Sequence, residues 1–489
     1  MDVWGGSGVN RIANRPVKTL LYFAAVLGIF FSTCSPASAL PAFARKYGMP
    51  CSSCHEAWPK LSPFGQQFKD NGYQMGNDRD APIFQSPAYW PVTFRITPQW
   101  HRESTNKAQV DGSNGPGGNE AQVTTHGFDW SGLDFHTGGT LAKDVSFYVL
   151  PSSDNTGAFH FESVWARLDN IGGSSWLNIK MGKFELDNLL SEKRILTLTG
   201  ISGVYTNYHF QPMYQPGVSE NPNFVFGIGD NQVGVEWLGH SKDDRTRISA
   251  SLLSSNDGSP GLPTSRGYDG FFAASRAFQL GSLGLQRVGG FAYIGEAPTY
   301  FQYNLTATTP IGTTTGGEPV TSTATTPYAG TGIGNKGFQR YGLIGMWYIK
   351  KFDITTIYFH GTDSAWLASN TAAVPGATLP VGAHSPSWNG GLFESHYNLS
   401  PQLILINRYE LVRMSQQAFT GDGVTAANPS NLGNTDVLTF GLRYYPFISS
   451  RAGFAYHAEY AIIRQRGASP VTFSDLTSSS LLFGFDFDF

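Results

Sequence analysis

The last residues of the chain, 481–489, read LLFGFDFDF. Successive residues of a β-strand point to opposite faces of its sheet. One face of this stretch is therefore apolar and aromatic, and the other is mostly small or acidic, with Leu481, Phe483, Phe485, Phe487 and Phe489 against Leu482, Gly484, Asp486 and Asp488. In a membrane-spanning barrel, alternate residues face lipid and lumen. We therefore predict a transmembrane strand at the end of the chain.

The same period of two recurs upstream. Residues 232–237 and 438–444 alternate apolar side chains with Gln, Gly, Glu, Thr and Arg, and the aromatic Phe489 is typical of the ends of bacterial outer-membrane barrels. An even number of strands is expected of a bacterial single-chain barrel. Sixteen candidate strands follow this pattern, near 90–100, 128–141, 145–152, 158–169, 175–185, 231–239, 245–254, 268–279, 283–294, 338–349, 352–361, 388–398, 401–411, 434–445, 452–464 and 478–489.

The connections between these strands sort by length. Those after even-numbered strands are tight, such as 142–144, 172–174, 241–244 and 350–351, whereas those after odd-numbered strands are mostly long, such as 101–127, 185–231, 295–337 and 361–387. Outer-membrane barrels have short periplasmic turns and long extracellular loops. We therefore expect the short connections and Phe489 on the periplasmic side, and the N-terminal segment on that side or inside the barrel lumen.

Two of the long loops carry their own expectations. Residues 304–327 are rich in Thr and Gly and predict an extracellular coil. Residues 186–230 contain several aromatic side chains and prolines. This loop either folds into the lumen as a constriction or lies outside as an ordinary loop.

Composition limits the class of protein. The chain has 489 residues, a net charge of -3, 14% charged and 14% aromatic residues and 57 glycines. That aromatic content and small net charge exclude a disordered chain. No basic stripe is present, so we expect no nucleic-acid partner.

Residues 1–39 predict an export signal peptide. Arg11, Arg15 and Lys18 precede the apolar run Leu20–Phe31, and Ala37-Ser38-Ala39 forms a cleavage pattern. The run is shorter than the ~20 residues that span a bilayer, which disfavours an N-terminal membrane anchor. A lipoprotein modified at Cys34 is disfavoured by the residues before it. No other stretch is apolar and long enough for a transmembrane helix.

Residues 51–55 read Cys-Ser-Ser-Cys-His, a complete C-x-x-C-H pattern. The thiols of Cys51 and Cys54 can add to the two vinyl groups of one haem, and His55 then supplies an axial ligand to its iron. A zinc site needs four ligands, and Cys34 is the only other cysteine. A redox cysteine pair expects a βαβ pattern that is missing here. The sequence therefore predicts one haem c.

The residues after the motif predict a short helix. Ser62-Pro63 is an N-cap followed by proline at the first helical position, and Asn71-Gly72 is a stop. Phe64 and Phe68 lie four residues apart, where they could pack on a porphyrin or only on each other. Met75 is our first choice for the second axial ligand. Met49, His101, His126 and a vacant or water-bound position remain alternatives.

These observations define the predicted organisation. The fold class is an all-β, 16-stranded transmembrane outer-membrane barrel, preceded by a small, mainly helical monohaem c-type cytochrome segment. The signal peptide takes residues 1–39, the cytochrome segment 40–88 and the porin-like barrel 89–489. A segment near 40 residues is too small for a core of its own, so haem or the barrel wall must stabilise it.

Several motifs resemble one known family. Leu40-Pro41-Ala42-Phe43-Ala44-Arg45, the Cys51–His55 motif, Leu61-x-Pro63-Phe64-Gly65-x-x-Phe68-Lys69 and Asn71-Gly72-Tyr73 resemble the N-terminus of fused cytochrome–porins of iron-oxidising bacteria. The specific likeness covers about residues 40–75, and Cys51, Cys54 and His55 carry over as haem residues. No residue carries over as a ligand of Fe(II).

The resemblance implies an iron oxidase or electron-transfer protein of the outer membrane. Extracellular Fe(II) is then the electron donor, a periplasmic cytochrome or cupredoxin the acceptor, and outer-membrane lipid the surroundings. Glu236, Asp486 and Asp488 could draw cations into the lumen or be ordinary pore-lining charges. Two other functions stay open: a diffusion porin with a haem plug or sensor, and a conduit for a donor other than Fe(II).

Overall fold

The fold is taken from a computed structural model of the chain. It describes residues 42–57, 60–75, 91–111, 118–153, 157–186, 231–254, 268–298, 301–313, 319–330, 335–368, 376, 378–379, 381, 384–385, 387–415, 434–448, 453–467, 472 and 474–488. The predicted signal peptide, most of the linker to the barrel, loop residues 187–230 and Phe489 lie outside these residues. The predicted division at residues 39 and 88 stays a prediction.

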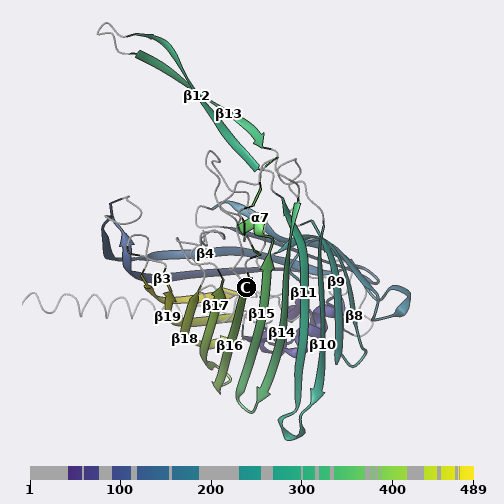
Figure 1. Ribbon diagram of the computed structural model, residues 1–489. Coiled ribbons are helices and arrows are strands. Elements are labelled where there is room, and N and C mark those ends of the chain that lie inside the picture. Colours follow the sequence, from purple (N-terminus) through teal and green to yellow (C-terminus); the bar gives the residue numbers. More distant parts are fainter. Residues whose placement is uncertain are drawn as a thin grey trace, which may run out of the picture. The chain divides into compact units, whose positions relative to one another are not determined.

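Sixteen antiparallel strands close into one barrel, which confirms the predicted fold (Figure 1). Each strand pairs with the next barrel strand along the chain, and β20 pairs with β3 to close the ring. Closure leaves no open sheet edge, as a membrane requires. In chain order the barrel strands are β3 (Val92–Gln109), β4 (Glu120–Ala142), β5 (Val145–Ser153), β6 (Phe159–Leu168), β7 (Asn178–Phe184), β8 (Gln232–His240), β9 (Thr246–Leu253), β10 (Asp269–Gln279), β11 (Leu285–Pro298), β14 (Asn335–Ile349), β15 (Phe352–Asp363), β16 (Ser387–Ser400), β17 (Leu403–Met414), β18 (Thr435–Ile448), β19 (Gly453–Gln465) and β20 (Leu476–Asp488).

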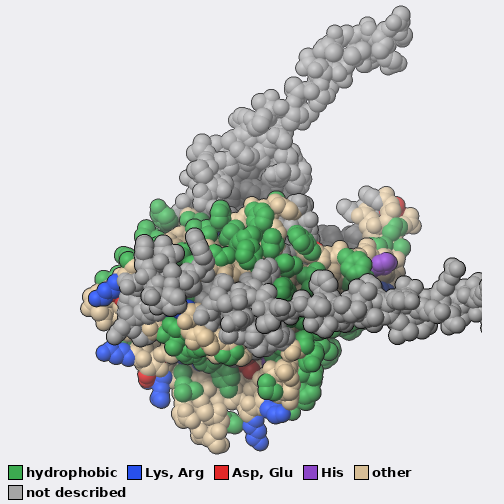
Figure 2. Space-filling model, turned by 180° about the vertical axis from the view of Figure 1, so that it is seen from behind, with side chains coloured by type: hydrophobic (Ala, Val, Ile, Leu, Met, Phe, Trp, Pro, Cys, Tyr) green, Lys and Arg blue, Asp and Glu red, His purple; other side chains and the backbone are tan. Residues whose placement is uncertain are grey.

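The two faces of the strands differ as the period of two predicts. On β20, Phe483 is 49% exposed while Asp486 is 2% exposed. On β18, Phe440 is 47% exposed and Thr439 is fully buried. Figure 2 shows hydrophobic side chains over much of the wall, with Lys and Arg side chains near its lower rim. The apolar face therefore points outward and the polar face inward.

The short connections lie where the sequence placed them. Residues 143–144 join β4 to β5, and 350–351 join β14 to β15. Asp144, Asp244 and Lys350 each adopt a positive φ, of 58°, 54° and 56°. Asp tolerates this left-handed conformation better than most residues, so two of these tight turns have favourable chemistry. No helix among the described residues is long and apolar enough to cross a membrane.

Two expectations about loops were wrong. The predicted loop 101–127 is largely strand, because β3 and β4 pair as far as Gln109 and Glu120. The predicted coil 304–327 is largely a β-hairpin of β12 (Phe301–Thr313) and β13 (Pro319–Gly330), outside the barrel sheet. Threonine is β-branched and favours strands, so a Thr-rich run can pair rather than remain coil.

The described residues 42–57 and 60–75, here called the N-terminal segment, hold three short helices. These are α2 (Ala42–Tyr47), α3 (Cys51–Cys54) and α4 (Pro63–Asp70). A small antiparallel pair, β1 (His55–Ala57) and β2 (Lys60–Leu61), lies between α3 and α4. The ends of α4 are those predicted, with Ser62 as N-cap and Pro63 at its start.

Candidate functional site

The Cys-x-x-Cys-His residues are tied to the start of α4. The Ser62 side chain accepts a hydrogen bond from the Gly65 amide and donates one to the Ser53 carbonyl at 2.9 Å. The Ser62 amide donates to the Cys54 carbonyl at 2.8 Å. A Cβ at Gly65 would lie 2.0 Å from that same Cys54 oxygen. Serine and glycine at these two positions therefore hold α3 directly against α4.

The end of α4 turns the chain toward the barrel wall. The amide of Tyr73 donates to the Phe68 carbonyl at 3.0 Å, and that of Gly72 donates to the Lys69 carbonyl at 3.1 Å. This is a Schellman ending, with Gly72 at the left-handed position at φ 78°. A Cβ on Gly72 would lie 2.8 Å from the carboxylate of Asp169. Glycine therefore supplies both the turn and the close approach.

Tyr73 packs among aromatic side chains of the barrel interior. Its ring stacks on Trp165 of β6, with centroids 6.1 Å apart and an interplanar angle of 19°. It also lies 6.3 Å from the ring of Tyr148 of β5. On its other side it stacks on Phe43 of α2 at 4.9 Å. This aromatic cluster joins the N-terminal segment to two neighbouring strands.

The two phenylalanines of α4 differ in burial and in packing. Phe68 is 6% exposed and packs edge-on against Phe43 and Tyr47, with centroids 5.2 and 5.7 Å away. Phe64 is 39% exposed. Phe68 therefore fills the aromatic cluster, while Phe64 leaves an apolar surface beside the Cys-x-x-Cys-His residues.

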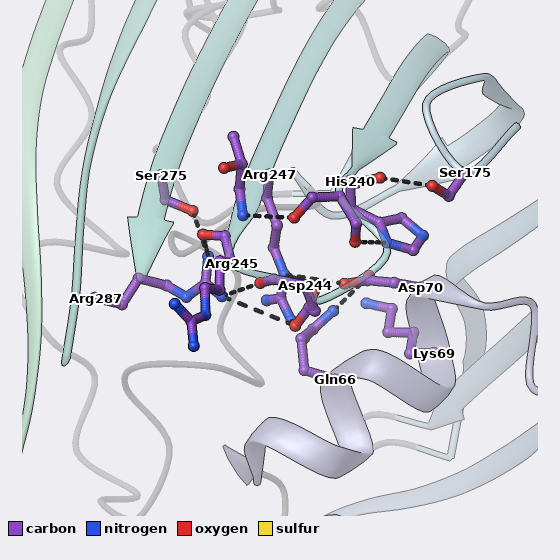
Figure 3. Close-up of polar contacts among 12 residues, drawn as sticks. Gln66, Lys69, Asp70, Ser175, His240, Asp244, Arg245, Arg247, Ser275 and Arg287 are labelled. Carbon is purple, nitrogen blue, oxygen red and sulfur yellow. Dashed lines mark hydrogen bonds and ion pairs between the residues drawn. The ribbon is translucent and has the colours of Figure 1, made fainter. Parts of the chain in front are cut away.

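Ion pairs hold α4 on inward-facing side chains of the barrel (Figure 3). Lys69 Nζ lies 2.7 Å from Glu185 Oε1, and both side chains are 9% exposed. Arg247 of β9 lies 3.4 Å from the carboxylate of Asp70. Arg167 of β6 donates to the Lys69 carbonyl at 2.7 Å while its Nε pairs with Asp169 at 2.6 Å. We call these residues the luminal clamp: Lys69, Asp70, Arg167, Asp169, Glu185 and Arg247.

The predicted ligands lie as follows. Cys54 ends α3 and His55 begins β1, and both are half-buried. The side chain of Cys51 lies outside the described part of the chain. Met75 is half-buried, its amide donates to the Tyr47 hydroxyl at 3.2 Å, and it packs against the aromatic cluster. Which group is the second axial ligand stays a prediction.

The alternative histidines lie in the barrel wall. His101 lies on β3, with Nδ1 4.0 Å from a carboxylate oxygen of Asp129. His126 lies on β4 and is exposed. Neither is hydrogen-bonded to the N-terminal segment by any bond that the structure records among the described residues.

Two of the three predicted luminal acids already have partners, and the third, Asp488, is buried. Glu236 is fully buried and forms an ion pair with Lys180. Asp486 lies 3.2 Å from Arg443 and 3.4 Å from Arg95. These carboxylates therefore balance neighbouring cations of the wall, which fits the reading of ordinary pore-lining charges.

The donor set suits a covalently attached haem. Cys51 and Cys54 begin and end one helical turn, and the imidazole of His55 follows directly. Burial raises the pKa of the Cys54 thiol to about 11, so this sulfur is a neutral thiol at ordinary pH. Covalent attachment would remove that titrating group, whereas zinc would need it ionised and would need further ligands. The residues present therefore fit a haem better than a metal ion.

The residues of the luminal clamp and their pairing were not predicted from the sequence. Arg167 and Glu185 could have been noticed as charges at strand positions. Their partners could not, because Lys69 and Glu185 are 116 residues apart in the chain.

A closed antiparallel barrel with an apolar exterior and a charged interior belongs to one class. Such a fold defines a porin-like β-barrel of the bacterial outer membrane.

No model of a known protein family matches the chain. A search of curated proteins also finds no match. Among solved structures, the chain is similar to the anion-selective porin from Comamonas acidovorans, at 11% identity and a TM-score of 0.47, over 81% of this chain and 99% of that one. It is also similar to OmpF of Salmonella typhi in complex with daunomycin, at 9% identity and a TM-score of 0.43, over 80% and 97%. A third similar structure is the outer membrane channel DcaP of Acinetobacter baumannii, at 9% identity and a TM-score of 0.41, over 82% and 99%.

Proposed function

We propose that this chain is an outer-membrane monohaem cytochrome–porin, which takes electrons from extracellular Fe(II) and passes them to a periplasmic electron carrier. The observation that carries the proposal is the luminal clamp. It fixes the helix that bears on Cys54 against inward-facing residues of the barrel. A diffusion porin needs no Cys-x-x-Cys-His motif, and a soluble cytochrome needs no barrel.

The chain's own residues have three tasks in this proposal. Cys51 and Cys54 would hold the haem, and His55 would ligate its iron. Ser62 and Gly65 position that turn on α4. A haem there would supply a one-electron carrier, which takes one electron from each Fe(II), leaves Fe(III) and yields the electron to the periplasmic acceptor.

The position of the N-terminal segment in the barrel explains why a barrel would serve electron transfer. The outer membrane insulates an extracellular donor from a periplasmic acceptor, so electrons need a carrier within the bilayer plane. The ion pairs of the clamp bring the N-terminal segment against β6 and β9, next to the short turns at residues 143–144 and 241–245. We assign this end to the periplasm, because outer-membrane barrels have their short turns there.

Iron is favoured as the donor for two reasons. Oxidation of Fe(II) releases one electron, which matches the capacity of one haem. The residues between 40 and 75 also resemble cytochrome–porins of iron-oxidising bacteria. The acceptor would be a small periplasmic cytochrome or cupredoxin.

The test has two stages. Mass analysis of the purified protein should show one covalent haem, and a Cys54→Ser variant should lose the normal two-bond attachment. Anaerobic mixing of the oxidised protein with Fe(II) should then give the spectrum of reduced haem. A protein without haem would overturn the whole proposal.

Other results would redirect the proposal. A haem reduced by an organic donor but not by Fe(II) at any pH tested would remove iron and keep the electron conduit. Sugar uptake into proteoliposomes that is equal for the wild type and Cys54→Ser would favour a diffusion porin with a haem plug or sensor.

A further inference from the structure

Four exposed lysines lie on the short turns of the barrel, at the end assigned to the periplasm. Lys143 is on the β4–β5 turn, Lys242 on the β8–β9 turn, and Lys350 and Lys351 on the β14–β15 turn. Lys and Arg side chains are visible along this lower rim of the barrel in Figure 2. We call these four residues the turn lysines.

The charges of the turn lysines are not neutralised within the described part of the chain. The structure records no ion pair or hydrogen bond there for Lys143, Lys242 or Lys350. Lys351 donates to an uncharged group, the Leu399 carbonyl, at 3.1 Å. Each of these side chains therefore has a positive charge that is available to a partner.

Acidic residues on the same turns do not balance these lysines. Residues 143–144, 241–245 and 350–351 include one exposed acid, Asp243, whose carboxylate lies 3.5 Å from Arg245. Asp244 pairs with Arg247 at the start of β9. The three turns therefore present an excess of positive charge at the periplasmic end.

Each turn that carries a lysine is joined to the N-terminal segment or to the luminal clamp. The amide of Asp169, a residue of the clamp, donates to the Asp144 carbonyl of the β4–β5 turn at 2.8 Å. Arg247, the second residue of β9, lies 3.4 Å from the carboxylate of Asp70 of α4. Tyr348, near the end of β14, packs against the hydrophobic core to which α4 contributes. The turn lysines therefore lie around the place where the segment is held and where an electron would leave the haem.

Two other short turns argue against lipid headgroups as the partner of these lysines. Residues 280–284 on the β10–β11 turn and 401–402 on the β16–β17 turn include no charged residue. Lipid surrounds a barrel on all sides, so lysines that only bind anionic headgroups are expected on these turns as well. Among the described short turns, the lysines are confined to those joined to the segment or the clamp. This placement favours a partner that docks beside the segment.

Resting on the proposed function, we propose that the turn lysines are the docking surface for the periplasmic electron acceptor, and that this acceptor is a carrier protein with an acidic face. Complexes between electron-transfer proteins have small, weak interfaces. Attraction between surfaces of opposite charge raises association rates by about 10- to 1,000-fold and is screened by salt. In the docked complex the reduced haem would lose one electron and the metal centre of the acceptor would gain it.

The experiment uses two probes that share a fold and differ in charge: a soluble cytochrome c, which is basic, and its succinylated form, which is acidic. Their binding to the purified protein in nanodiscs of phosphatidylcholine is measured at low and at physiological ionic strength. At low salt the wild type should bind the acidic probe at least about tenfold more tightly than the basic one. Added salt should reduce this difference.

Two double variants remove the same charge at opposite ends of the barrel. Lys242→Gln with Lys350→Gln should weaken binding of the acidic probe by roughly 3- to 10-fold and reduce its salt dependence. Lys107→Gln with Lys336→Gln is the control and should leave binding unchanged. Lys336 is at the other end of β14 from Lys350, and Lys107 is at the corresponding end of β3. Heat-modifiable migration on gels verifies that each barrel is folded.

Electron exchange links the binding to the proposed function. In haem-loaded protein, the rate of exchange with the acidic probe, run in its downhill direction and followed by rapid-freeze EPR, should fall in the Lys242/Lys350 variant and not in the control. An unchanged rate would overturn the docking role.

The binding data give further grounds for rejection. Equal binding of the two probes by the wild type, or equal losses in the two double variants, would overturn the proposal. So would a rise in the melting temperature of the wild type, but not of the Lys242/Lys350 variant, on addition of phosphatidylglycerol, because the lysines would then bind lipid headgroups. Binding of the probes needs no haem in this chain. Absence of covalent haem from the wild type would therefore overturn the proposed function separately, and the two failures are distinguishable.

Discussion

Replacing Lys69 by methionine should release the N-terminal segment from the barrel wall. Lys69 Nζ and Glu185 Oε1 are 2.7 Å apart, and each side chain is 9% exposed. Methionine keeps most of the apolar stem of lysine but removes the charge. The buried ion pair to Glu185 would then be broken, and removing one partner of a buried pair typically costs about 3–5 kcal/mol.

That energy sets the expected size of the effect. A tenfold change in an equilibrium constant corresponds to about 1.4 kcal/mol, so the docking equilibrium should weaken by roughly two to three and a half orders of magnitude. The upper part of this range assumes that Glu185 stays charged and dry. Partial entry of water would bring the loss toward the lower part.

Proteinase K digestion of the folded protein in detergent measures the effect. The barrel resists the protease while its strands are paired, whereas an undocked segment is cleaved. Lys69→Met should therefore shorten the lifetime of the full-length band and leave a heat-modifiable barrel core.

Two variants make the reasoning refutable. Lys143→Met removes one lysine from an exposed turn and should leave the cleavage rate unchanged. The double variant Lys69→Met with Glu185→Gln removes both charges and should recover much of the protection, because no uncompensated carboxylate remains. Equal cleavage of Lys69→Met and the wild type, or a double variant cleaved faster than the single one, would refute the account of the clamp.

Three further results follow from the residues around the motif. Gly65→Ala should reduce haem attachment in cells, because its Cβ would lie 2.0 Å from the Cys54 carbonyl, whereas Gly127→Ala, with 3.9 Å to its nearest atom, should not; pigment per barrel measures this. In protein made without haem attachment, alkylation of Cys54 should be slow at pH 8 and rise with a mid-point near pH 11, since burial raises the pKa of this thiol to about 11 and only the thiolate reacts; a mid-point near pH 8.5 would contradict it. His55→Ala should abolish the low-spin spectrum while the barrel stays inserted, and an unchanged spectrum would exclude His55 as a ligand.

Most of the barrel was predictable because its signal is local. All sixteen predicted strands are present. Each strand shows the signal within its own residues, because its side chains alternate between lipid and lumen. The ends of β3 and β4 were missed for the same reason. Residues 121–126 are exposed throughout, so no alternation marks them as strand. Where both faces of a hairpin meet water, the period of two disappears from the sequence.

In the N-terminal segment, too, local features could be predicted from the sequence and long-range contacts could not. The limits of α4 follow from Ser62-Pro63 and Asn71-Gly72, whose chemistry acts within a few residues. The partners of α4 on β6 and β9 depend on how the barrel closes. Arg167 reaches the Lys69 carbonyl across 98 residues of chain, and no local pattern encodes that distance.

The inward-facing residues of the barrel wall beside α4 are buried from water, and this burial favours a fixed conduit over a removable plug. A sixteen-stranded barrel is wide enough to enclose an aqueous channel, in which inward charges would be wet. Arg167 and Lys180 are instead 1% exposed, and Trp165 between them is covered by Tyr73. Withdrawing α4 would break the pair to Glu185 and uncover this stacked wall together, so docking is strongly favoured at rest. Electron transfer needs a carrier at a constant distance from its partners, and a segment held by both apolar stacking and buried charge meets that requirement where a tethered plug would not.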